Sequence, residues 1–223
     1  MKVPVYLEVT RKRTFAGALE WPGWCRSGKT PEDALEALVA YADRYAAVIS
    51  RAGLGFERPS GVDDLEVVER LTGNATTEFG APGIAPKADA RPLPPKELLR
   101  LTAILEASWR AFDRAADAAR GVTLTKGPRG GGRNLSKMTN HVFEAEEGYV
   151  GALGSHPPRP SGEALAKRAA ALRSSAVAAL AARAAGMPVA DPRNTKHPWS
   201  PRFYVRRSAW HALDHAWEIE DRS

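Results

Sequence analysis

Apolar and polar side chains recur with two different periods along this chain. Residues 3–10 place apolar side chains at every second position, at Val5, Leu7 and Val9, which is typical of a half-buried strand. A second short strand is expected over residues 15–21, after a basic turn at residues 11–13. The two strands are therefore predicted to pair as a hairpin.

A helical period follows the hairpin. Thr30 suits the N-cap position, Pro31 suits the first helical position, and acidic residues follow directly. This helix is expected to reach about Arg51, before Gly53 and Gly55. The pattern of residues 64–71 fits another strand or a short helix equally well.

The second half of the chain has the helical period almost throughout. Residues 81–95 are rich in proline and lack periodicity, so they are expected to form an extended linker. Helices are predicted over residues 96–120, from 134 or 135 to about 153, over 161–186 and over about 201–221. The predicted fold class is α+β: a small N-terminal α/β domain (residues 1–80) of a strand hairpin plus a helix, followed by an all-α, up-and-down four-helix bundle (residues 96–223).

Composition narrows the class of protein. Of 223 residues, 43% are hydrophobic and 26% are charged, which is typical of a globular protein. No stretch approaches the roughly 18 apolar residues that cross a bilayer, so no membrane segment is expected. The single cysteine, Cys25, excludes an internal disulfide and a cysteine-based zinc site, and it favours a reducing, cytoplasmic location.

The net charge of +6 would suit a protein that binds nucleic acid. The basic excess lies after residue 95, where basic side chains are scattered along helices and not gathered into a run with interleaved aromatic residues. A solvated basic surface explains this pattern, and nucleic acid is not favoured as a partner.

Three of the five histidines lie in predicted bundle helices. His211 and His215 are four residues apart, so their imidazoles lie on the same face of a helix and can converge on one ion. His141, in the second bundle helix, can supply a third ligand. Three imidazoles leave coordination positions open, as in catalytic zinc sites, and they also suit nickel or ferrous iron. The alternative is that each histidine is an ordinary hydrogen-bonded core or surface residue.

An acidic residue near these histidines can accept a hydrogen bond from the ring nitrogen that does not bind the metal, and so fix the orientation of the imidazole. The candidates are Asp214, Glu218 and Glu144, although surface ion pairing is the commoner role of such residues.

Two segments carry a family resemblance. Asn140–Glu146 through Tyr149, and Ala209–Glu218, resemble in order and spacing the DinB-like family, which includes mycothiol-dependent maleylpyruvate isomerase and thiol S-transferases. The resemblance covers about residues 96–221. It implies a four-helix bundle whose divalent metal, most simply zinc, is held by His141, His211 and His215.

The same resemblance implies a reaction class. A metal-bound low-molecular-weight thiol would be added or transferred to a small electrophilic substrate. Apart from the resemblance, the position of Arg207 one turn before His211 leaves two readings open: it meets a carboxylate of the thiol or the substrate, or it faces solvent. The alanine-, arginine- and proline-rich composition suggests a high-GC bacterium and hence mycothiol. Two other functions stay open: a metal-dependent hydrolase, and a non-catalytic regulatory protein with a metal-stabilised bundle.

Residues 3 to about 50 are similar, more weakly, to HicB-like antitoxin domains. The similarity lies in the strand pair, the turn Trp21–Cys25 and the helix start Ser27–Leu35. It implies a module that forms a homodimer or covers a substrate site, since a bundle follows where that family has a DNA-binding element.

Other sequence features are less specific. Residues 23–30 satisfy the phosphate-loop pattern, but the residues before the linker are too few for the parallel sheet of a nucleotidase. Residues 127–132, with Arg129 and Arg133, form either an anion-binding helix start or a mobile loop. Cys25 has no histidine near it in sequence, and His156 and His197 lie in proline-rich segments and receive no role.

Overall fold

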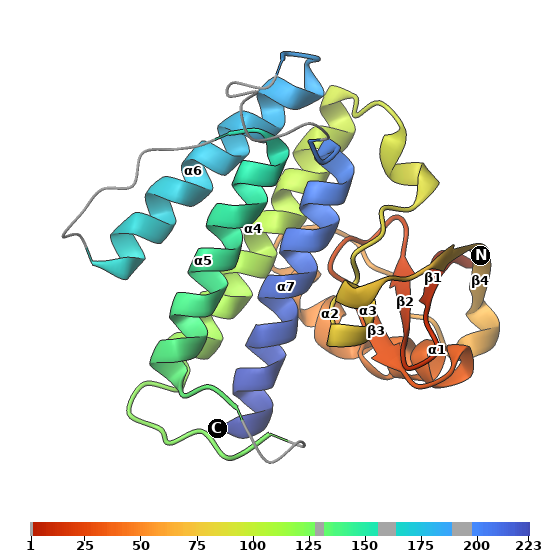
Figure 1. The fold of residues 1–223 in the computed structure, drawn as a ribbon, viewed down its shortest axis with the longest axis horizontal. Coiled ribbons are helices and arrows are strands. Elements are labelled where there is room, and N and C mark those ends of the chain that lie inside the picture. The colour runs from red at the N-terminus through yellow and green to blue at the C-terminus, as the bar shows by residue number, and fades with distance from the viewer. Residues whose placement is uncertain (1, 128–131, 156–163, 189–197) are drawn as a thin grey trace.

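The computed structural model describes residues 2–127, 132–155, 164–188 and 198–223. These residues form an α+β fold with one four-stranded mixed sheet and seven α-helices (Figure 1). The strands are β1 (Val3–Val9), β2 (Thr14–Ala18), β3 (Cys25–Gly28) and β4 (Leu65–Thr72). The helices are α1 (Pro31–Ala40), α2 (Ala42–Ser50), α3 (Ala75–Phe79), α4 (Pro95–Ala118), α5 (Leu135–Leu153), α6 (Leu165–Ala184) and α7 (Pro201–Arg222), with short 3₁₀ turns at Val62–Asp64 and Lys87–Ala90.

The predicted hairpin is confirmed and is part of a larger sheet. The strand order is β3-β2-β1-β4, with β1–β2 and β2–β3 antiparallel and β1–β4 parallel. Residues 64–71, left open between strand and helix, are mostly strand β4. Gly17 lies opposite Tyr6, and a Cβ at Gly17 would lie 2.6 Å from the Tyr6 ring. The absence of a side chain at Gly17 thus leaves room for the Tyr6 ring.

The helix predicted from Thr30 to Arg51 is interrupted. It starts as expected, because Thr30 and Asp33 form a reciprocal capping box and Pro31 occupies the first turn. At Tyr41 the backbone leaves the helical conformation, which separates α1 from α2. The Tyr41 ring packs on Trp217 of α7, with the Arg26 guanidinium 3.9 Å from its centroid. Apolar periodicity alone did not indicate this break.

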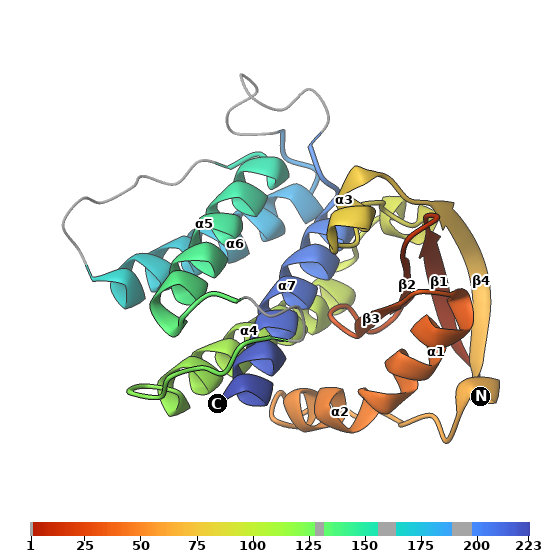
Figure 2. The same ribbon diagram turned by 60° about the horizontal axis from the view of Figure 1, so that its bottom comes forward.

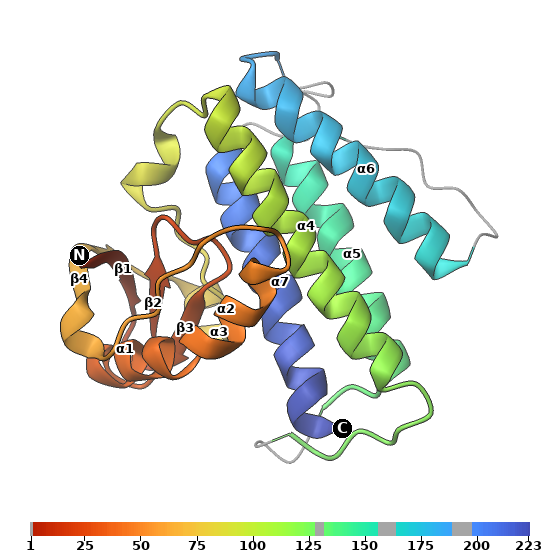
Figure 3. The same ribbon diagram turned by 180° about the vertical axis from the view of Figure 1, so that it is seen from behind.

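The four long helices, α4 to α7, lie alongside one another on one side of the sheet and its helices (Figure 1). Turning the molecule shows α7 between α5 and α6 on one side and the sheet on the other (Figure 2). From behind, α2 packs against α4 (Figure 3). Most of α7 is buried, and one apolar core runs continuously from the sheet into the long helices.

Residues 81–95, predicted as an extended linker, are packed against both parts. Glu8, fully buried in β1, accepts hydrogen bonds from the Gly83 and Ile84 backbone N–H groups and from the Thr77 hydroxyl. Asp89 is buried and forms an ion pair with Arg206 of α7 at 2.7 Å. The segment therefore connects the sheet to α7. The proposed division into domains at this point stays a prediction.

Candidate metal centre

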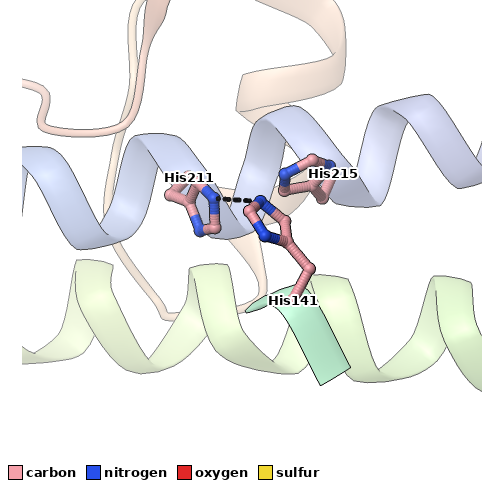
Figure 4. A group of neighbouring side chains, drawn as sticks. All are labelled: His141, His211 and His215. Atoms are coloured by element: carbon pink, nitrogen blue, oxygen red, sulfur yellow. Dashed lines mark hydrogen bonds between the residues drawn. The ribbon is translucent and has the colours of Figure 1, made fainter. Parts of the chain in front are cut away.

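Helices α5 and α7 position the three histidines. Helix α5 begins after Asn134, whose side chain caps the Lys137 N–H, and α7 begins after Ser200, which caps Phe203. His141 extends from α5 toward α7, where His211 and His215 lie one turn apart on the same face (Figure 4). The predicted convergence of three imidazoles is present.

The imidazoles are in close contact. The Nε2 atoms of His141 and His211 are 3.4 Å apart, and one ring nitrogen from each of the three side chains lies within 4.8 Å of the others. His211 and His215 are buried, while His141 is half-buried. The cluster thus combines a buried side, formed by α7, with a more accessible side at His141.

Burial and nearby positive charge keep the imidazoles of His141 and His211 neutral. Burial, with Arg133 and His215 nearby, lowers the pKa of His141 to about 4. Burial lowers the pKa of His211 well below its ordinary value, and His215 and Arg207 add to the effect. Neutral imidazole is the form that binds a metal ion, so both side chains are ready to ligate at neutral pH.

A carboxylate orients the third imidazole. His215 Nδ1 lies 3.0 Å from Glu218 Oε2, and Arg222 donates to the other carboxylate oxygen at 2.7 Å. The hydrogen bond from His215 holds the pKa of Glu218 below its usual range, so the carboxylate accepts and Nδ1 donates. This leaves His215 Nε2 as the free ligand nitrogen, as in metal sites whose histidines are held by a carboxylate.

Of the three predicted orienting acids, only Glu218 contacts a histidine in the described residues. Asp214 pairs instead with Arg26, at 2.8 Å, and Glu144 is exposed. Sequence reasoning missed Glu146, which is buried and pairs with Arg173 of α6 at 3.2 Å. Glu146 lies five positions after His141, outside the three- or four-residue spacing that places two side chains on one helical face. Its burial follows from the packing of α6 against α5.

Arg207 lies in the same region as the histidines. Its guanidinium lies 5.0 Å from the Tyr149 ring centroid and 4.6 Å from that of Trp210, and the Tyr149 ring packs edge-on against His211 at 5.5 Å. The side chain is buried, with 9% of its surface exposed.

The structure gives the less favoured motifs other surroundings or roles. The phosphate-loop pattern falls on strand β3, where residues 25–28 pair with β2. Cys25 is buried, and burial raises the pKa of its thiol to about 12, so it stays protonated and unreactive at neutral pH. Arg133 contributes its backbone carbonyl to Arg222. Arg129, His156 and His197 lie outside the described residues.

The donor set fits a divalent ion. Three imidazoles, one of them held by a carboxylate, match the ligands of zinc, nickel and ferrous iron sites and leave coordination positions open. Among the described residues, these three histidines are the group of three or more His, Cys, Asp or Glu side chains that lie closely enough together to hold a metal ion.

Comparison of the chain with protein-family models, with curated proteins and with solved structures returns no match. None of the described helices is long and apolar enough to span a membrane.

Proposed function

We propose that this protein is a divalent-metal-dependent enzyme with an up-and-down four-helix bundle of the DinB-like type, acting as a thiol-dependent S-transferase or isomerase on a small electrophilic substrate. The observation that carries the proposal is the convergence of His141, His211 and His215 from two helices on one point. The reaction class rests on the sequence resemblance of α5 and α7.

In this proposal the three histidines and Glu218 have different roles. The three imidazoles hold the ion, zinc being the simplest choice, and Glu218 fixes the orientation of His215. A divalent ion held there supplies Lewis acidity, which lowers the pKa of a thiol such as mycothiol. Burial of the α7 side limits water at the cluster, and half-buried His141 lies on the side from which ligands enter.

The first experiment measures metal content by elemental analysis of protein purified without an affinity tag. About one equivalent of zinc, nickel or iron is expected, and each of His141→Ala, His211→Ala and His215→Ala should lose it. The matched controls are His156→Ala and His197→Ala, which should retain it. No metal after purification or reconstitution would contradict the proposal.

A second experiment separates the reaction classes. Metal-loaded protein is incubated with mycothiol and an electrophile such as chlorodinitrobenzene, and loss of the electrophile is followed. Thiol-dependent loss that His211→Ala abolishes supports the transferase. Ester or amide hydrolysis without a thiol would identify a hydrolase instead, and a metal-loaded protein with neither activity would be a regulatory protein.

A further inference from the structure

Four arginines of α7 are buried, and Arg202, Arg206 and Arg222 each pair with an acidic side chain. Arg206 donates to both oxygens of Asp89 at 2.7 Å and to the carbonyls of Ala18 and Leu19. Arg202 binds Glu97 and the carbonyls of residues 91 and 92. These two follow the usual rule that a buried charge has a counter-charge and full hydrogen bonding.

Arg207 departs from this rule. Its Nη1 is buried without a hydrogen-bond partner in the part of the chain that the structure describes. No acidic side chain of the described residues forms an ion pair with it. A guanidinium stays charged at neutral pH, so Arg207 is a buried cation without a matching anion among the described residues.

Two aromatic rings cover the guanidinium. Tyr149 of α5 and Trp210 of α7 lie close to it, and cation–π attraction offsets part of the cost of burying the charge. Such attraction does not satisfy N–H donors. The donors that remain can form the paired, in-plane hydrogen bonds that a carboxylate accepts from arginine.

The position of Arg207 connects it with the histidines. It precedes His211 by one helical turn, and Tyr149 contacts both side chains. We propose that Arg207 is the receptor for the carboxylate of a small ligand whose other end reaches the histidine cluster. The second half of this proposal rests on the proposed function, whereas the carboxylate receptor does not.

The matched variants are Arg207→Met, Arg206→Met and Arg110→Met. Arg110 is an exposed arginine whose pair with Glu106 lies on the surface of α4. If Arg207 serves binding and not folding, removing its unpaired charge leaves the melting temperature unchanged or raises it by about 2–4 °C. Arg206→Met should lower it strongly or prevent folding, because Asp89 loses its partner.

Binding is measured first on metal-free protein. Propionate should raise the melting temperature of the natural chain and of Arg110→Met, and should have no such effect on Arg207→Met. The propionate experiment does not involve the metal. It therefore tests whether Arg207 binds a carboxylate even if the histidines hold no ion.

Cobalt-loaded protein then tests the connection to the cluster by calorimetry. 3-Mercaptopropionate should bind at least about tenfold more tightly than 3-mercapto-1-propanol, which lacks the carboxylate, and Arg207→Met should abolish the difference. If propionate binds beside 3-mercapto-1-propanol without displacing it, the carboxylate belongs to a second substrate; if the two compete, it belongs to the thiol.

Two results would overturn the receptor. One is equal propionate binding by Arg207→Met and the natural chain. The other is a fall in melting temperature in Arg207→Met similar to that in Arg206→Met, which would show that Arg207 is a structural residue. Failure of the chain to bind cobalt, with Arg207-dependent propionate binding intact, would refute the proposed function and leave the receptor standing.

Discussion

The Nε2 atoms of His141 and His211 lie 3.4 Å apart although 70 positions separate the two residues in the chain. Two imidazole nitrogens directed at each other in a partly buried site form at best one hydrogen bond between them. A metal ion held at this point would accept both nitrogens as ligands, and the remaining nitrogen of His215 as well. The packing of α5 against α7 is therefore what creates the candidate site.

Replacing Glu218 by glutamine should weaken metal binding without abolishing it. The amide keeps the shape of the side chain but loses the negative charge that accepts the hydrogen bond from His215 Nδ1. Loss of such an orienting group typically lowers the affinity for the metal roughly 10- to 100-fold. Competition with a chromogenic chelator measures the change. Glu144→Gln, on an exposed position of α5, is the control and should bind metal as the natural chain does.

The metal-free protein should lose stability as the pH falls from about 6.5 toward 4. In the folded chain the pKa of His141 is lowered to about 4 and that of His211 is lowered well below its ordinary value of 6.5. The unfolded chain therefore binds more protons in this window, and protonation favours unfolding. The full contribution to stability is present above pH 6.5.

Chemical denaturation at a series of pH values in the presence of a chelator measures this effect. The double variant His141→Ala/His211→Ala should show a flatter profile between pH 6.5 and 4. An identical slope in the double variant and the natural chain would mean that these imidazoles are not the groups that titrate.

Replacing Asp89 by asparagine should destabilise the fold by about 3 kcal/mol or more. Asp89 and Arg206 are both buried, and removing one partner leaves an uncompensated charge. Urea denaturation measures the change in the free energy of unfolding. Asp43→Asn is the control, because its pair with Arg58 is exposed and should contribute less than about 1 kcal/mol.

The sequence predicted those features that depend on local patterns. Capping at Thr30, the helical period of α4 and α7 and the four-residue spacing of His211 and His215 depend on residues close together in the chain, and the structure contains them. The predicted resemblance to the DinB-like family stays a prediction.

Features that depend on distant partners could not be predicted in the same way. Strand β3 is four residues long and lacks apolar alternation, so only its pairing with β2 defines it. The choice between Glu218 and Asp214 as the partner of a histidine depends on Arg26, which draws Asp214 away from the cluster. The interruption at Tyr41 likewise depends on Trp217, far along the chain.

Helix α7 contacts the sheet side through Arg206, packs on α4 and α5, and carries two of the three histidines. During synthesis it is made after every other element of the described fold. A ribosome-bound chain that has not reached residue 215 therefore has neither a covered core nor a complete set of ligand nitrogens. Metal loading at the proposed site would consequently be a late event, and an ion retained there would report that α5 and α7 have packed together.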